Sequence, residues 1–348
     1  MTDADAAAAG SGDSSADSAP STADELEPAS SEPAPRAAKS ALDSSAGSSG
    51  APPESAVVAD PSDAFQALGN EVRMEILEAM LERVDGEGPD RASFSELFEA
   101  TSPDTSAGFA YHLDELVGHY LRKTDEGYAF TYAGEKIARA IAAGSYTRRA
   151  SSPSIAIDDP CPLCDSNELH AAARDNVVSI SCEECERTLC RLGFPPSGFD
   201  AHGDALPAAV DRHHRHRISV LGDGVCPECA GAVDGRLEAP DERVAADLPP
   251  EFTDHVHATF ECRSCGYDLS CPVTLSVLEH PTALAFYRNH DRDLRDRPIW
   301  NVGSEWTEAV LADEPTIVRV ATALDGETLE LYVDDTASVV ATRRVDDA

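Results

Sequence analysis

Eight of the ten cysteines in this 348-residue chain fall into four Cys-x-x-Cys pairs, and this spacing restricts the possible folds more than any other feature. Two pairs together supply four thiolates, the tetrahedral set of soft ligands that Zn²⁺ prefers. The gap inside the first set is 17 residues, as in zinc ribbons, whereas the gap of 32 in the second requires an insertion. Because four thiolates leave no open position for a catalytic water, we predict two structural zinc sites. Their ligands are Cys161, Cys164, Cys182 and Cys185 in the first set and Cys226, Cys229, Cys262 and Cys265 in the second.

The two sets look like copies of one design. An apolar run precedes Cys182 and another precedes Cys262, and each run predicts a strand that ends in a cysteine pair. A fifth cysteine follows each set, at Cys190 and at Cys271. These two residues are either exchangeable ligands or small buried side chains, and their apolar surroundings favour burial. Redox use of the pairs is less well supported, because no thioredoxin-like βαβ pattern surrounds them.

The charge balance indicates an unusual solvent. The chain carries 64 acidic and 27 basic residues, for a net charge of −37, and Arg outnumbers Lys 24 to 3. This composition is typical of a halophile, in which molar salt reduces the Debye length to about 3 Å. The acidity therefore says little about partners. No apolar run reaches the length of a membrane span, and the start of the chain does not resemble a signal peptide, so we predict a cytoplasmic protein without a membrane partner.

Residues 1–60 consist mainly of Ala, Ser, Asp, Glu, Pro and Gly and contain no aromatic side chain. Such a segment buries too little apolar surface to offset its conformational entropy. We predict a disordered acidic tail, with partner binding as the alternative.

Helical periodicity begins after this tail. The pattern predicts helices at about 62–69, 71–83 and 94–100, and a fourth helix that starts near Asp104 and buries Phe109, Leu113 and Leu116. Two short strands around an Asp-Glu-Gly turn and a helix at about 132–143 follow. This is the element order of a winged helix-turn-helix domain over residues 61–147.

Three stretches of this region resemble the ArsR-like winged helix-turn-helix transcriptional regulators, here of a haloarchaeal type. They are the run from Phe65 to Leu77, Tyr111-His112-Leu113 in the fourth helix, and Gly127-Tyr128 at the wing turn. The resemblance implies a homodimer that binds double-stranded DNA, with the fourth helix in the major groove. The first cysteine is Cys161, so the region lacks the ligands by which metal-sensing members of that family detect metal.

The exposed side of the fourth helix is the predicted contact with DNA. Small or hydrogen-bonding groups there can approach base edges, and wing cations can approach the adjacent backbone. His112 flanks this surface, where it would contact a phosphate or pack between helices with a hydrogen bond. The region carries 16 acidic and 7 basic residues, so recognition has to depend on base contacts and local cations. The predicted DNA-binding residues are Thr105, Ser106, Gly108, Tyr111, His112, Arg122 and Lys123.

Residues 158–348 form the predicted C-terminal region, with zinc-ribbon units at 158–200 and 222–275 and a closing helix plus β-hairpin. The basic run at 211–217 contacts nucleic acid, binds metal through His213 and His216, or forms a solvated face, which we favour. His280 is expected to be a helix cap or a structural side chain and not a ligand.

The sequence as a whole predicts an α+β protein with a winged helix-turn-helix domain and a duplicated zinc-ribbon domain. No Gly-rich phosphate loop, HExxH motif or nucleophile elbow is present, so an enzyme is not expected. The leading hypothesis is a DNA-binding transcriptional regulator of a halophilic archaeon, with a zinc-stabilised C-terminal effector or dimerisation domain. The alternative is a module that binds the transcription machinery, since archaeal transcription factor E also combines a winged helix with a zinc ribbon.

Overall fold

The computed structural model describes residues 59–84, 91–239 and 256–346. The predicted tail lies outside these ranges except for residues 59 and 60, and so does most of the insertion expected between the cysteine pairs of the second set. In the described ranges the chain is α+β with several antiparallel sheets. None of their helices combines the length and apolar character needed to cross a membrane.

Residues 61–142 form five helices and a three-stranded antiparallel sheet with strand order β1-β3-β2. The helices lie close to the predicted positions. The fourth starts later than expected because Thr105 is its N-cap, with the Thr105 hydroxyl accepting a 3.0 Å hydrogen bond from the Gly108 amide. The elements are α1 (Pro61–Gln66), α2 (Glu71–Val84), β1 (Arg91–Ala92), α3 (Phe94–Ala100), α4 (Ser106–Leu116), β2 (Leu121–Thr124), β3 (Gly127–Phe130) and α5 (Tyr132–Ala142).

Strand β1 was not predicted, because two residues carry no periodicity. It pairs with β3, and the turn of the β2–β3 hairpin depends on this contact. Gly127 has φ of 133°, and a Cβ at this position would collide with the Ala92 carbonyl of β1. The core of this region includes Ile76, Leu77 and the predicted stripe of α4.

The first cysteine set lies in a four-stranded antiparallel sheet with order β4-β5-β6-β7. We call residues 152–193 the first unit. It starts before the predicted boundary at 158, because β4, which contains Pro153 and lacks alternation, pairs with β5. Its strands are β4 (Ser152–Ala156), β5 (Leu169–Arg174), β6 (Val177–Cys182) and β7 (Thr188–Gly193).

The second set lies in a three-stranded antiparallel sheet with order β10-β9-β8. We call its described residues, 226–239 and 256–272, the second unit. The strands predicted before Cys182 and Cys262 are confirmed as β6 and β9. The strands of the second unit are β8 (Val233–Glu238), β9 (His257–Cys262) and β10 (Asp268–Pro272).

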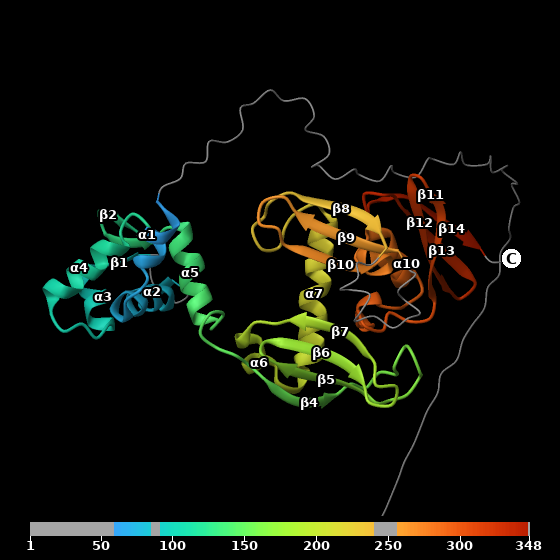
Figure 1. The fold of residues 1–348 in the computed structure, drawn as a ribbon, viewed down its shortest axis with the longest axis horizontal. Helices are drawn as coiled ribbons and strands as arrows, with labels where there is room; N and C mark the ends of the chain where they lie inside the picture. The colour runs from blue at the N-terminus through green and yellow to red at the C-terminus, as the bar shows by residue number, and fades with distance from the viewer. Residues whose placement is uncertain (1–58, 85–90, 240–255, 347–348) are drawn as a thin grey trace, which may run out of the picture. The chain divides into compact units, whose positions relative to one another are not determined.

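Helix α7 (Leu206–Gly222) connects the two units and contacts both (Figure 1). His214 Nε2 lies 3.0 Å from the Gly193 carbonyl of the first unit, and the Arg217 guanidinium lies 4.9 Å from the centre of the Tyr267 ring in the second. The remaining helical segments of this region are α6 (Pro196–His202), η1 (Gly203–Ala205), α9 (Val273–Val277), α10 (Pro281–Asn289) and η3 (Leu294–Asp296).

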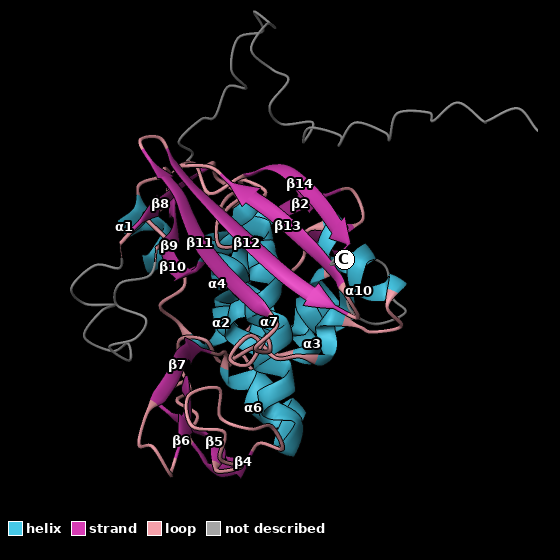
Figure 2. Cartoon of the chain, turned by 90° about the vertical axis from the view of Figure 1, so that its right-hand side faces the viewer, coloured by secondary structure: helices cyan, strands magenta, loops and turns pink. Residues whose placement is uncertain are grey.

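The C-terminal sheet is larger than predicted. The expected hairpin is present, with Asp325 and Gly326 in its turn, but a further strand flanks it on each side. Figure 2 shows its strands side by side in the order β11-β12-β13-β14. The strands are β11 (Trp306–Asp313), β12 (Thr316–Leu324), β13 (Glu327–Val333) and β14 (Val339–Asp346).

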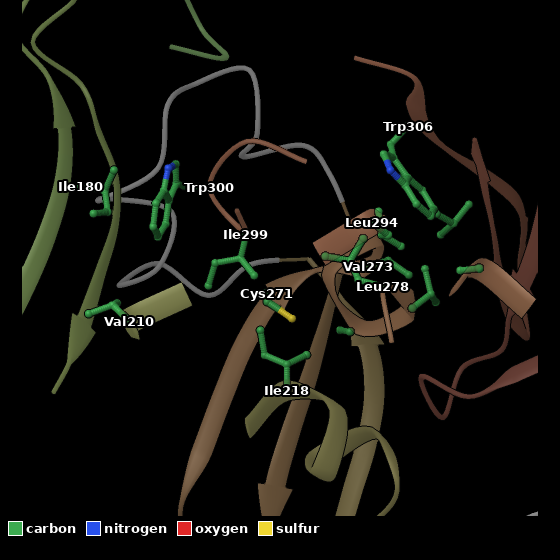
Figure 3. Close-up of a cluster of buried hydrophobic side chains, with 14 of the residues drawn as sticks. Ile180, Val210, Ile218, Cys271, Val273, Leu278, Leu294, Ile299, Trp300 and Trp306 are labelled. Atoms are coloured by element: carbon green, nitrogen blue, oxygen red, sulfur yellow. The ribbon is translucent and has the colours of Figure 1, made fainter. Parts of the chain in front are cut away.

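One hydrophobic core joins both units, α7 and the C-terminal sheet. Figure 3 shows Ile180 of the first unit near Trp300, and Ile218 of α7 below Cys271 of the second unit. Val210 and Ile218 come from successive parts of α7, so opposite halves of this helix pack on different units. This shared core includes Cys161 and Cys182 of the first set.

Candidate metal centres and nucleic-acid interface

All eight predicted ligands converge as two separate clusters. Within each cluster the four sulfur atoms lie within 4.8 Å of one another. In the first, Cys161 Sγ is 3.9 Å from Cys185 Sγ, and Cys164 Sγ is 3.7 Å from Cys182 Sγ. In the second, the matching distances are 3.7 Å for Cys226 and Cys265 and 3.5 Å for Cys229 and Cys262.

These distances fit a metal ion and not disulfides. Four sulfurs at about 2.3 Å from a tetrahedral ion are separated by about 3.8 Å, whereas a disulfide bond measures about 2.05 Å. All ten cysteines are free thiols. The donor set is thiolate only, so a bound ion would have a closed shell and would link the two cysteine pairs of its unit. The clusters are therefore compatible with zinc.

The four cysteine pairs share one backbone geometry. The residue after the second cysteine of each pair has a positive φ: 58° for Asp165, 55° for Glu186, 58° for Ala230 and 70° for Gly266. This turn directs backbone amides toward sulfur, as at Leu163 and Glu228, whose N–H groups donate to Cys161 Sγ at 3.5 Å and Cys226 Sγ at 3.4 Å. Only Gly266 gives a sequence signal for this conformation.

Hydrogen bonds also favour the thiolate at one cysteine of each cluster. Burial raises the pKa of Cys182, but the Cys185 amide and the Ser166 hydroxyl outweigh it and lower that pKa to about 6. The amides of Cys265 and Ser264 lower the pKa of Cys262 to about 6 as well. Sequence reasoning missed Ser166, whose Oγ lies 3.2 Å from Cys182 Sγ, because nothing marks a serine near a cysteine pair as a partner.

Cys190 and Cys271 belong to neither cluster. Burial raises the pKa of each thiol to about 12. They are also not equivalent to each other. Cys190 lies opposite Ile180, two residues before Cys182, whereas Cys271 lies opposite Ala258, four residues before Cys262. The fifth cysteine is thus not a repeated feature of the two units.

The favoured interpretation of the basic run at 211–217 was wrong for its central residues. The run lies in α7, where Asp211, His214 and Arg215 are only 6%, 7% and 4% exposed. Asp211 Oδ1 accepts a 2.8 Å hydrogen bond from the Ile299 amide, and Arg215 donates to the Arg297 carbonyl at 2.5 Å. These contacts hold α7 against residues 297–299, because the amphipathic helix turns part of the run toward the core.

Among the described residues, no metal-ligating group includes His213 and His216. The predicted role of His280 is confirmed: its Nδ1 accepts a 3.2 Å hydrogen bond from the Thr282 amide at the start of α10.

The residues predicted to contact bases lie at the beginning and on the exposed side of α4. Thr105 and Ser106 are exposed at its N-terminus, Gly108 is half-buried, and Tyr111 is 58% exposed. His112 is half-buried, and its Nδ1 makes no hydrogen bond within the described part of the chain. The hydrogen bond expected for a packing histidine is therefore not seen at this nitrogen.

The predicted wing cations are exposed on β2. Arg122 Nε donates to the Phe130 carbonyl at 3.1 Å, and Lys123 Nζ lies 6.0 Å from the centre of the Tyr128 ring. Neither side chain forms an ion pair with another described residue. Nearby, Glu115 of α4 pairs with Arg73 at 3.4 Å, which offsets one of the acidic groups on this helix.

Two family models match parts of the chain. A model described as a domain of unknown function, DUF7351, matches residues 158–339, just over half of the chain. The chain belongs to this family. A second model, the domain of unknown function DUF7347, matches residues 61–141. Comparisons with curated proteins and with solved structures gave no match.

Proposed function

We propose that this member of the DUF7351 family is a sequence-specific DNA-binding transcriptional regulator, in which residues 61–142 act as a winged helix and α4 enters the major groove. The observation that carries the proposal is the exposed side of α4 beside a hairpin with two unpaired cations. Tyr111 supplies an aromatic ring and a hydroxyl, and Thr105 and Ser106 lie at the helix N-terminus. Groups of this kind can approach base edges, and the two cations can approach the adjacent phosphates.

The acidity of the region is the main objection, because Asp104 and Asp114 are exposed on or near the same helix. In molar salt the counterion-release contribution to DNA binding is small, and so is the repulsion between screened charges. Base contacts and a few local cations then decide affinity. We therefore also propose that the protein binds DNA in a cytoplasm of molar salt concentration.

Each cysteine cluster is proposed to hold one Zn²⁺ with a structural role. The ion would fix the two cysteine pairs of each unit relative to each other and would contribute folding free energy to the C-terminal region. This region would then serve for dimerisation or for response to an effector.

Selection of duplexes from a random pool in multimolar KCl tests this function. We expect one preferred sequence for the wild type. Tyr111→Ala and Ser106→Ala should each cost about 1–3 kcal/mol and change the preference at one position, whereas Arg122→Ala with Lys123→Ala should weaken all sequences alike.

Matched controls come from α5, where Tyr132 is 78% exposed and Lys136 is also exposed. Tyr132→Ala and Lys136→Ala should leave the selected sequence unchanged. If the folded wild type selects no sequence, the regulator is excluded, and binding to the transcription machinery becomes the better hypothesis.

A further inference from the structure

The two units present outer sheet faces that correspond position by position. Cys182 pairs with Leu169 in the first unit, and Cys262 pairs with Val233 in the second, so the registers can be aligned. In the first unit, the residues that alternate with the buried ones form the face turned away from the core. In the second unit, the face is defined by the equivalent register positions, of which His257 and Thr259 are buried. We call these surfaces the first-unit face and the second-unit face.

The first-unit face carries no acidic side chain at its ladder positions. Leu169, Ala171 and Ala173 of β5 are buried, so the residues between and after them point outward. The same alternation on β6 and β7 adds a valine, two serines, a threonine and an arginine. The resulting set is His170, Ala172, Arg174, Val177, Ser179, Ser181, Thr188 and Arg191.

Both arginines of this face are available for a partner. Arg174 and Arg191 are exposed, and neither side chain forms an ion pair or hydrogen bond with another described residue. From strand and residue spacings, their Cα atoms are about 12 Å apart, far enough for each guanidinium to meet a separate phosphate. On β6, Ser179 lies directly opposite Arg191, and Ser181 lies two residues further along the same face.

The equivalent positions of the second unit have the opposite character. Asp234, Glu238, Glu261 and Asp268 replace His170, Arg174, Ser181 and Thr188. The one basic residue, Arg236, is neutralised by Glu238 at 2.8 Å and Glu261 at 3.2 Å. One fold thus carries an acidic face in one copy and a face with unpaired cations in the other.

A third cation lies in a segment that is hydrogen-bonded to the turn after Arg174. The amide of Ala150 donates to Asn176 Oδ1 at 2.7 Å, and Asn176 Nδ2 donates to the Arg148 carbonyl at 3.1 Å. These bonds attach the segment before β4 to the β5–β6 turn, which directly follows Arg174. The attached segment includes Arg149, which is exposed and forms no ion pair among the described residues.

Acidic residues gather at the other end of the sheet, near the cysteine cluster. Glu183 lies 3.8 Å from His170, and Glu168 and Glu186 are exposed nearby. The cationic part of the first-unit face is therefore the end farthest from the metal ligands. In a chain of net charge −37, this end of the first unit carries three exposed arginines without an ion pair among the described residues, and one exposed acidic residue, Asp175, follows Arg174 in the turn.

We infer that the first-unit face binds the sugar–phosphate backbone of the DNA that residues 61–142 are proposed to read. This inference rests on the proposed function. Exposed guanidinium groups and serine hydroxyls are the usual partners of phosphate oxygens, and contacts of this kind add affinity without sequence preference. The segment between α5 and β4 is short, residues 143–151, so a second contact on the same duplex would form at high effective concentration.

The test compares the double variant, in which Arg174→Ala and Arg191→Ala are combined, with the wild type. Binding to the selected duplex and to a scrambled duplex is measured by fluorescence anisotropy over a range of KCl concentrations. We expect affinity to fall about two- to fivefold for each arginine, by the same factor on both duplexes. The slope of log affinity against log salt should decrease by about 2.

Arg212→Ala with Arg288→Ala removes two other exposed arginines and should leave affinity and slope unchanged. Unaltered zinc content and circular dichroism establish that the variants fold. Wild-type affinity and slope in the Arg174/Arg191 variant overturn the inference, and the proposed function still stands if Tyr111→Ala alters the selected sequence. A folded wild type that binds no DNA overturns both.

A partner of another class gives a different result. If poly-L-glutamate binds the wild type and loses this binding in the double variant, while DNA affinity does not change, the face binds an acidic polypeptide and the DNA inference is wrong.

Discussion

The first and second units share three strands and a cluster of four cysteines but differ in how this cluster joins the core. Cys161 and Cys182 belong to the hydrophobic core, and Cys185 packs against it. In the second unit Cys226 and Cys262 are buried but lie outside that core, and Cys229 and Cys265 are exposed. The same four-thiolate cluster is thus central to packing in one copy and peripheral in the other.

This difference shows which features of the repeat are constrained. The positive φ after each cysteine pair and the amide–sulfur contacts occur in both units, because the ligand geometry requires them. The outer faces and the surroundings of the cluster carry no such requirement. They differ in charge and in burial, so the two copies can serve different purposes.

Loss of a metal ligand should have the largest effect. We expect Cys182→Ser and Cys262→Ser each to lower zinc content from about two ions to about one, since structural zinc contributes about 10–16 kcal/mol of apparent binding free energy in isolated peptides. Cys182→Ser should lower the melting temperature further, because its cluster belongs to the shared core. Elemental analysis and thermal melts in high salt measure both quantities.

Cys164→Ser and Cys229→Ser are a matched pair of exposed ligands that test the same ranking. Equal shifts in melting temperature for the two variants would show that the cluster in the core contributes no more to stability than the other cluster. A metal-free protein that remains folded would contradict the structural role of both ions.

Many features of the two units are predictable from the sequence, and the features that were not predicted have identifiable physical causes. The cysteine spacing gives all eight ligands, and the apolar runs give β6 and β9, because ligand number and strand alternation are local. Helix α7 was misjudged at Asp211 and Arg215, whose burial depends on a loop more than 80 residues later in the chain. A run of charged residues predicts an exposed segment. Here the hydrogen-bond partners that allow burial are backbone groups far away in the sequence, which the run itself does not reveal.

The faces of the two units were also beyond sequence reasoning. The charge of a face depends on strand register, and the bulge between Ile180 and Ser181 shifts the register of β7 relative to β6. This shift and a one-residue difference in spacing, five residues after Cys185 but six after Cys265, together separate Cys190 from the position of Cys271. The prediction for α4 did not depend on strand register, because helical periodicity alone puts Tyr111 on the side opposite the buried stripe.

A smaller effect is expected from the contact between α7 and the first unit. Burial lowers the pKa of His214 from 6.5 to about 4, with smaller contributions from His213 and Arg217. The folded state therefore binds fewer protons than the unfolded state between these values, so stability is full above pH 6.5 and falls as the pH decreases toward about 4. The loss should reach about 3 kcal/mol at most.

Denaturant melts of His214→Gln between pH 5 and 7, compared with the wild type, isolate this contribution from that of the thiolates. The variant should show a weaker dependence on pH. His216→Gln changes an exposed histidine of the same helix and should retain the wild-type slope. If His214→Gln keeps the full slope, the buried contact with Gly193 does not link protonation to stability.

The smallest effect should come from the fifth cysteines, and it tests whether the two units hold their metal in the same way. Cys190 and Cys271 occupy non-equivalent positions outside the clusters, and burial keeps both thiols protonated with a pKa of about 12. Cys190→Ala and Cys271→Ala should therefore retain two zinc ions per chain, lose roughly 1 kcal/mol of stability from reduced packing, and leave DNA binding unchanged. Iodoacetamide should modify neither thiol in the folded wild type, because the thiolate is the reactive form. Loss of one zinc ion in Cys190→Ala alone would mean that the first unit uses a ligand that the second lacks, and the clusters would then differ in chemistry as well as in burial.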